Sequence, residues 1–412
     1  MKNKVLSNII SLYVVQGLNY LVPLLITPLL LRVLGLEIYG LYTVILAILQ
    51  YVIIFLDYGF NLTATKQISL NQNSKKNTSQ IFSDIMTIKL IALLIIILTV
   101  AVSLLIKTTF DLYLEMVLLG FGIVIGRTLN PVWLFQGVEK MHWIATLNGL
   151  SKLLMLILVF FLIKDEGDLD LLIIIQSAIG IIVVVSSVML SMSKGYITLV
   201  TPSKQGMMKQ LQLGKDIFIS TISVSIYTTS IPLVLAFIGG VESAGIYNAA
   251  DKLRQAIQSI INPISQGLFP KSNQLMVSDK RKAFIFIYKV SAFISVLIVS
   301  ICLAVYAASD FIVDLLYGEN MGEVVKLLGA LLFIPPIVAL SNMLGLQIII
   351  PNGKSNWFKY TYILAGLIGL PMIIVGALSY SYLGVGVAAV IVELVVLSMF
   401  VFEVRRSWKN QH

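Results

Sequence analysis

Charge is scarce in this chain of 412 residues. Aspartate, glutamate, lysine and arginine make up 12% of the sequence, whereas hydrophobic residues make up 58% and the mean hydropathy is +0.95. A soluble protein carries about 25% charged residues, so half of the expected charge is missing. Apolar runs of about 20 residues, each long enough to cross the hydrocarbon core as a helix, recur from end to end. The composition therefore excludes a soluble globular protein and predicts an all-α integral membrane protein.

Residue types that carry metal or redox chemistry are almost absent. Cys302 is the single cysteine, so it cannot form an internal disulfide, and we expect it to pack as a small apolar residue. The two histidines, His142 and His412, are too few and too far apart for a zinc site. The sequence contains no G-x-x-x-x-G-K-[ST], H-E-x-x-H or C-x-x-C motif. We therefore expect no metal, no cofactor and no ATP hydrolysis by this chain.

Hydropathy and helix breakers predict twelve transmembrane helices. They are expected near residues 9–31, 38–60, 85–106, 113–136, 143–163, 171–192, 214–238, 244–269, 284–307, 323–350, 357–379 and 382–403. The first is too long for a secretory signal peptide and lacks a small-residue cleavage site, so we expect it to remain as a helix.

The loops between these spans divide by charge. Those on one side hold most of the lysines and arginines, whereas those on the other hold only Arg32, Lys107 and Lys164. The positive-inside rule then places both termini in the cytoplasm. The net charge of +9 is thus explained by membrane topology, and no nucleic-acid partner is expected.

A short motif occurs twice. "GLEIYGLY" at 35–42 returns as "GVESAGIY" at 240–247, an offset of 205 residues (240 − 35). The identical pairs are Gly35 and Gly240, Glu37 and Glu242, Gly40 and Gly245, Tyr42 and Tyr247, and further along Gln50 and Gln255. Two halves of six helices with the same orientation indicate parallel repeats about an axis along the membrane normal. We therefore predict two pseudo-symmetric six-helix bundles, residues 1–195 and 214–412, with a cytoplasmic linker at 196–213 and a substrate site between the bundles.

Polar residues form a stripe on the predicted eighth helix. Spacings of 3, 4, 3 and 4 place five side chains on one face, with Lys252 and Arg254 beside them: Asn248, Asp251, Gln255, Gln258 and Asn262. The equivalent helix of the first half carries Gln50 and Asp57. We expect both helices to line a polar cavity.

Further charges lie within other spans: Arg127, Lys152 and Glu393. A charge in mid-bilayer costs about 2.5–3.5 kcal/mol, so six such groups facing lipid would cost roughly 15–20 kcal/mol. They must face water or one another. One alternative is internal pairing, of Asp251 with Arg254 and of Glu393 with Lys152 or Lys252. The other is a water-filled cationic lumen that receives an anion, since four cations face two acids.

Three weaker patterns carry structural predictions. Gly122 and Gly126 predict close helix packing. The tryptophans near the cytoplasmic helix ends, Trp133, Trp143, Trp357 and Trp408, suggest an interfacial belt. Lys89 and Lys289 lie about one turn from cytoplasmic ends, and we expect their ammonium groups to reach the interface.

Three segments resemble the O-antigen flippases of the Wzx type, which belong to the multidrug/oligosaccharidyl-lipid/polysaccharide (MOP) exporter superfamily. They are "PVWLFQGVEKMHWIATLNGLSKLL" at 131–154, "LDYGFNLTATKQIS" at 56–69 and "IIIPNGKSNWF" at 348–358. The resemblance implies a V-shaped pair of bundles in the bacterial inner membrane, as in the related MATE exporters. It also implies transfer of an undecaprenyl-pyrophosphate-linked oligosaccharide from the cytoplasmic to the outer leaflet. Membrane lipids, an O-antigen polymerase and a chain-length regulator are the implied partners.

The resemblance also suggests roles for the polar residues of the spans. Arg127, Lys152, Lys252 and Arg254 would attract the pyrophosphate or sugar acids, and Gln50, Asn248, Gln255, Gln258 and Asn262 would bind sugar hydroxyls. Asp57, Asp251 and Glu393 could bind a coupling H⁺ or Na⁺. In the family motif, Glu139 and Lys140 could serve as an inner gate or a loop lock.

Two other functions stay open from the sequence. A multidrug exporter on the same fold would favour an acidic, aromatic-lined cavity for cationic drugs, whereas the charges here are in net positive balance. An integral-membrane polysaccharide polymerase would need a large external loop, and the longest one expected here, near 308–322, is short.

Overall fold

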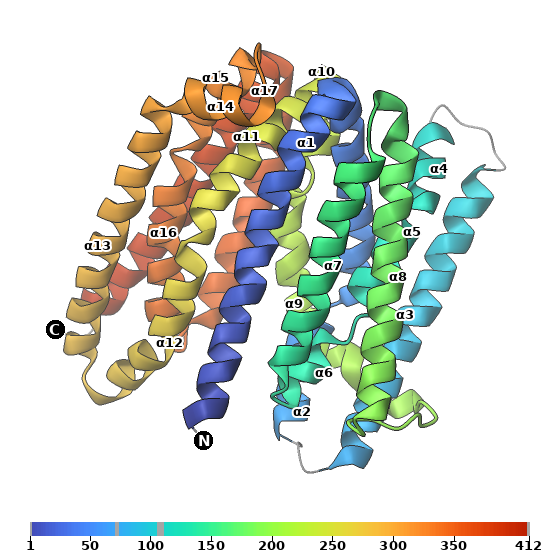
Figure 1. Ribbon diagram of the computed structural model, residues 1–412. Helices are drawn as coiled ribbons and strands as arrows, with labels where there is room; N and C mark the ends of the chain where they lie inside the picture. The colour runs from blue at the N-terminus through green and yellow to red at the C-terminus, as the bar shows by residue number, and fades with distance from the viewer. Residues whose placement is uncertain (1, 71–73, 105–110, 410–412) are drawn as a thin grey trace. The chain divides into compact units, whose positions relative to one another are not determined.

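The computed structural model describes residues 2–70, 74–104 and 111–409, and within these ranges the regular elements are all helices (Figure 1). Residues 1, 71–73, 105–110 and 410–412, and with them Lys107 and His412 of the sequence predictions, lie outside the described residues. By their internal packing the helices form two compact units. The first is Met1–Ile26 with Ile45–Ile222, and the second is Thr27–Val44 with Ser223–His412. The bundle limits drawn from the repeat stay a prediction.

The described residues up to Thr228 form nine α-helices. They are α1 (Lys2–Asp57), α2 (Phe60–Leu70), α3 (Lys75–Leu104), α4 (Asp111–Leu119), α5 (Phe121–Thr128), α6 (Val132–Gly137), α7 (Met141–Leu162), α8 (Leu169–Ser193) and α9 (Lys204–Thr228). Figure 1 shows α7 and α8 side by side, with α5 next to α8. A 3₁₀ turn, η1 (Glu166–Asp168), precedes α8.

The second part continues with α10 (Ile231–Gly239), α11 (Val241–Ser259), α12 (Ile261–Ser278), α13 (Lys280–Ala307), α14 (Ser309–Tyr317), α15 (Gly322–Leu331), α16 (Ile334–Leu344) and α17 (Ser355–Lys409). A π-helical segment, η2 (Gly345–Ile349), follows α16. Pro335 and Pro336 lie in the first turn of α16. The backbone N–H groups of a first turn have no partner within the helix, so the N–H that proline lacks costs no hydrogen bond there.

Eight helical segments in the described ranges are long and apolar enough to cross a membrane, or nine with the bent pair at residues 113–137. Two of them, residues 22–70 and 356–408, each join two spans at a break, at Gly35 and at Tyr380–Ser381. The α11–α12 segment adds one more span. α11 is a continuous helix of 19 residues, and it is absent from the apolar segments only because its charged side chains lower its hydropathy. The nine segments, the two extra spans created by the breaks and the α11–α12 segment together make twelve spans, the number predicted from hydropathy.

The repeated motif has a structural role in both halves. Gly35 (φ 72°, ψ 171°) and Gly240 (φ 83°, ψ 162°) have the same left-handed backbone, which only glycine adopts without strain. Each glycine therefore lets one span turn into the next. The two copies also pack against each other within the second unit: a Cβ on Gly40 would lie 1.9 Å from the carbonyl oxygen of Val241, and one on Gly245 would lie 3.2 Å from the Cα of Gly40.

Close helix packing at the glycines of α5 is confirmed. A Cβ on Gly122 would lie 2.4 Å from the Ser177 Cβ, and one on Gly126 would lie 2.4 Å from the Gly180 Cα. Small residues on both helices therefore let α5 and α8 approach almost backbone to backbone.

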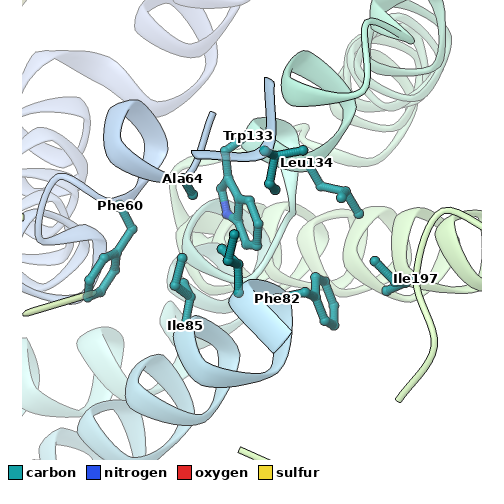
Figure 2. Close-up of a cluster of buried hydrophobic side chains, with 9 residues drawn as sticks. Phe60, Ala64, Phe82, Ile85, Trp133, Leu134 and Ile197 are labelled. Atoms are coloured by element: carbon teal, nitrogen blue, oxygen red, sulfur yellow. The ribbon is translucent and has the colours of Figure 1, made fainter. Parts of the chain in front are cut away.

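Trp133 does not belong to an interfacial belt, so that part of the prediction is wrong. Its side chain is 0% exposed and lies among Phe60, Ala64, Phe82 and other apolar side chains of α2, α3 and α6 (Figure 2). The chain breaks at Pro131, just before α6, and the short helix turns the indole inward against α2 and α3. Proximity to a helix end therefore did not mean that the side chain is exposed at the membrane interface.

The segment before α9 is held against α3. The Ser79 hydroxyl accepts from the Thr198 amide (2.9 Å), and Asp84 Oδ1 accepts from the Ser203 amide (2.7 Å). The Ser203 hydroxyl in turn accepts from the Gly206 amide and caps the first turn of α9. Because of this cap, the helix begins at Lys204, and residues 204–213 of the predicted linker are helical.

Candidate functional site

The charged side chains of the spans gather in separate clusters, and we name the first one, in unit 1, the Arg127 cluster (Gln50, Arg127 and Lys152). Arg127 lies at the end of α5, and its Nη1 donates to Oε1 of Gln50 on α1 at 3.0 Å. Its side chain is exposed in the protein, while Lys152 on α7 is half-buried. The positive charge of Arg127 acts on the Lys152 ammonium. Three helices thus bring two cations and a neutral amide together.

The second cluster, the Asp251 cluster, lies on α11 of unit 2 and comprises Asp251, Arg254, Gln255 and Gln258. Arg254 Nε donates to Asp251 Oδ1 at 2.5 Å, and Gln255 Nε2 donates to Asp251 Oδ2 at 2.5 Å. A further guanidinium N–H of Arg254 is bonded to the amide oxygen of Gln258. The side chains of Arg254 and Asp251 are 14% and 15% exposed. Pairing of Asp251 with Arg254, one of the two predicted alternatives, is confirmed for this pair.

Glu393 on α17 is half-buried, and the charge of Arg254 acts on its carboxyl group. Arg254 therefore lies within electrostatic range of two acids. Lys252, its neighbour on α11, is half-buried as well.

The predicted polar stripe is interrupted near its C-terminal end. The helix expected over 244–269 is divided, because α11 ends at Ser259 and α12 begins at Ile261. At the break, the Ile260 amide bonds to the Ile257 carbonyl, a tighter turn than that of an α-helix. Asn262 is therefore on a different helix from the rest of the stripe. At the other end, Asn248 accepts a hydrogen bond from the Tyr39 hydroxyl (2.8 Å), so it belongs to the contact between the repeat copies.

Asp57 has a partner that the sequence did not suggest. Lys89 Nζ lies 2.9 Å from Asp57 Oδ1 and 2.8 Å from the Thr128 carbonyl oxygen, and Asn61 Nδ2 donates to the other carboxylate oxygen at 2.6 Å. Lys89 is 1% exposed, so the prediction that it reaches the interface is wrong.

The reason is that two helices end around this ammonium group. α1 ends at Asp57, followed by Tyr58 and Gly59 with positive φ, and α5 ends at Thr128. The carbonyl end of a helix carries partial negative charge and favours a cation. Lys89 meets two such ends and a carboxylate. Together they stabilise its ammonium group more than solvation by water would.

A second ion pair, between a loop lysine and the end of the last span, was also missed. The Lys354 ammonium bonds to Glu403, whose side chain is 2% exposed, and the Ser407 hydroxyl approaches the same carboxylate oxygen. Lys354 precedes the predicted span at 357–379 and Glu403 ends the following one, so two opposite charges at neighbouring span ends were the signal for this pair. In the described part of the chain, no three His, Cys, Asp or Glu side chains lie close enough to hold a metal ion.

The sequence comparisons identify the family. A family model described as polysaccharide biosynthesis protein matches residues 5–276, about two thirds of the chain. A protein of Escherichia coli (strain K12) named "Putative O-antigen transporter" is 30% identical over 400 residues, which are 97% of this chain and 96% of the relative. This chain belongs to the polysaccharide biosynthesis protein family.

A second member of the family, from Shigella dysenteriae and with the same name, is 27% identical over 370 residues, 88% of this chain and 90% of its own. The names of both relatives describe transporters, and the apolar helices make this family member a multi-pass membrane protein.

Solved structures confirm the predicted fold class. The inward closed conformation of the lipid II flippase MurJ matches with a TM-score of 0.77 at 13% identity, over 97% of this chain and 87% of that one. An inward-facing multidrug resistance MATE family transporter of the MOP superfamily matches with a TM-score of 0.74 at 14% identity, over 93% and 94%. At these identities the likeness shows the fold alone. The family member therefore has the fold of these transporters, and the predicted resemblance to the MOP superfamily is confirmed at the level of the fold.

Proposed function

We propose that this transporter moves an undecaprenyl-pyrophosphate-linked oligosaccharide, an O-antigen or related repeat unit, from the cytoplasmic to the outer leaflet of the bacterial inner membrane. Family membership supports the polysaccharide class of substrate. The Arg127 cluster is the observation that carries the finer proposal. It places two cations within spans, and the side chain of Arg127 is exposed in the protein.

The chemistry of the substrate matches this cluster. A pyrophosphate is a dense anion, and the planar guanidinium of arginine binds phosphate oxygens through two parallel hydrogen bonds. In the proposed path, Lys152 and Lys252 contribute further positive charge, while Arg254 is paired with Asp251. Polar side chains such as Gln255, Gln258 and Asn262 meet the sugar hydroxyls. The polyprenyl tail stays in lipid, where it costs no desolvation.

Coupling to an ion gradient is part of the proposal. Asp57 and Asp251, two of the three predicted coupling acids, hold ion pairs with Lys89 and Arg254. Glu393 forms no salt bridge among the described residues, and it is half-buried within electrostatic range of Arg254. We assign H⁺ or Na⁺ binding to Glu393.

The experiment locates the lipid-linked oligosaccharide in cells that carry the cognate pathway and lack this gene. We expect accumulation on the inner face of the membrane, relieved by the wild-type gene and by Arg281→Gln, which alters an exposed arginine in the first turn of α13. Arg127→Gln should restore less than a tenth of the transfer. Glu393→Gln should support transfer that no longer responds when the ion gradient is collapsed.

Outward transfer in the deletion strain would exclude the flippase function. Normal transfer of single repeats with failed polymerisation would instead indicate a polymerase. Equal rescue by Arg127→Gln and Arg281→Gln would leave the flippase in place and remove the Arg127 cluster from the path.

A further inference from the structure

The ammonium group of Lys89 lies among groups that would suit a free cation. The Asp57 carboxylate (2.9 Å) and the Thr128 carbonyl oxygen (2.8 Å) accept its hydrogen bonds, and the centroid of the Phe60 ring lies 5.8 Å from Nζ. A carboxylate, a carbonyl oxygen and an aromatic face are groups that bind alkylammonium ions. Because the side chain of Lys89 is 1% exposed, these contacts take the place of water around the charge.

The acceptor groups are held in place without the help of Lys89. Asp57 ends α1, Phe60 begins α2, and Thr128 ends α5, where the last carbonyl oxygens have no partner within the helix. Asn61 Nδ2 donates to Asp57 Oδ2 at 2.6 Å and so fixes the carboxylate with its other oxygen toward the ammonium group. Lys89 reaches these groups from a separate helix, α3. The fold therefore builds the acceptors on α1, α2 and α5, and α3 supplies the cation.

A cation that is covalently attached behaves differently from a coupling ion. Its occupancy does not depend on the concentration of any free ion, and it is not released on the other side of a membrane. A Na⁺ ion on the Asp57 carboxylate would lie close to the Lys89 ammonium group, and like charges repel strongly where water is largely excluded. Asp57 is therefore closed to a free cation while Lys89 is in place.

We propose that the groups around Asp57 form a binding site for one alkylammonium ion, and that the chain fills this site permanently with its own Lys89. The first unit then takes up no coupling ion at Asp57, and the ion step of transport belongs to Glu393 in the second unit. The site itself stands on the contacts of Lys89, whereas its separation from coupling rests on the proposed function and deepens it.

Chemical rescue tests the site. Lys89→Ala removes the side chain beyond Cβ and leaves the space of a propylammonium ion. We expect propylammonium chloride to raise the melting temperature of full-length Lys89→Ala in lipid nanodiscs in a saturable way, by about 2 to 4 °C at ten times its apparent Kd. The uncharged 1-propanol has nearly the same shape and should have no such effect.

Matched variants separate the site from general effects of the amine. Adding Asp57→Asn to Lys89→Ala should raise the apparent Kd for propylammonium at least about tenfold, because the carboxylate is the charged acceptor of the site. The wild-type protein, whose site is filled, should show no saturable rise. Lys289→Ala, which truncates an exposed lysine, should show none either.

Transport tests the separation from coupling. Lys89→Met combined with Asp57→Asn removes both charges together, so neither is left unpaired. In the transfer assay of the proposed function, the measured quantity is the ratio of transfer with and without the ion gradient. We expect this double variant to keep the wild-type ratio, whereas Glu393→Gln should bring the ratio close to one.

Each arm has a result that would overturn the inference. The site is excluded if propylammonium stabilises Lys89→Ala no more than 1-propanol does, or if its apparent Kd is the same without the Asp57 carboxylate. Loss of the gradient response in the double variant would also overturn the inference, and this measurement decides alone if Lys89→Ala does not fold. Outward transfer in the strain that lacks the gene would instead refute the proposed function, and the rescue experiment would still decide whether the site exists.

Discussion

Lys89→Met tests whether the buried ammonium group is a structural centre of the first unit. The substitution keeps an unbranched side chain of similar length and removes the charge. Two hydrogen bonds disappear, one to Asp57 and one to the carbonyl of Thr128. Because Thr128 is 0% exposed, its carbonyl loses a partner that water cannot easily replace.

The expected loss follows from these two contacts. Leaving a buried acceptor unsatisfied costs about 1–3 kcal/mol. Removing one partner of a buried ion pair costs about 3–5 kcal/mol, which here is an upper limit because the Asp57 side chain is 27% exposed and water can solvate it in part. We therefore expect Lys89→Met to lower the free energy of unfolding by about 3 kcal/mol.

Reversible unfolding of the detergent-solubilised protein by denaturant measures this difference. Lys289→Met is the matched control, since sequence position predicted the same behaviour for both lysines and Lys289 is exposed. It should change the free energy of unfolding by less than about 0.5 kcal/mol. The double variant Lys89→Met with Asp57→Asn should be more stable than Lys89→Met alone, because no unpaired carboxylate remains. Equal effects of Lys89→Met and Lys289→Met would refute the reasoning.

Two further predictions concern the repeat contact and a helix cap. Gly40→Ala places a Cβ 1.9 Å from the Val241 carbonyl oxygen, so we expect it to lower the free energy of unfolding by at least about 3 kcal/mol. Gly322→Ala, the control, has open space around its Cβ and should not change the free energy of unfolding measurably. Equal stability of the two variants would contradict the contact. Asp279 accepts from the Lys282 amide at the start of α13, which holds the pKa of this carboxyl below its ordinary value of 3.8. Since the folded-state pKa is depressed, the stabilisation is present above the ordinary value and is lost as the pH falls through the folded pKa. The Asp279→Ala variant should therefore have a lower melting temperature than wild type at pH 7, and the two melting temperatures should converge under strongly acidic conditions. A difference in melting temperature that does not change with pH would argue against a stabilising role of the Asp279 charge.

The parts of the fold that depend on periodicity and on single glycines were predictable from the sequence. Hydropathy alone predicts the spans, because crossing hydrocarbon requires about 20 apolar residues in a row. The repeat of Gly35 at Gly240 predicts equal turns, and both glycines have the same left-handed conformation. The pair at i, i+3 on α11, Asp251 with Arg254, could be predicted because both residues lie on one helix.

Contacts between helices were not predictable in this way. Lys89 and Trp133 both lie near the ends of predicted spans, where hydropathy suggests an interface. Each is buried instead, because the chain breaks at Tyr58–Gly59 and at Pro131 and folds short segments over them. A single sequence gives the length of a span, but it does not show which other helix end will face a given side chain.

Charge balance gives the clearest link from these contacts to transport. The sequence left two arrangements open for the charges of the spans: pairing of Asp251 with Arg254 and of Glu393 with a lysine, or a water-filled cationic lumen. In unit 2, Asp251 binds Arg254 and the same arginine acts on Glu393, so both acids lie with one cation. In unit 1, Arg127 meets an amide oxygen and acts on a second cation, Lys152. If Glu393 takes up a proton or a cation, as proposed, the second unit gains positive charge at that step, beside the arginine that acts on this carboxyl group. Loading of Glu393 would therefore raise the electrostatic affinity of the second unit for an anion.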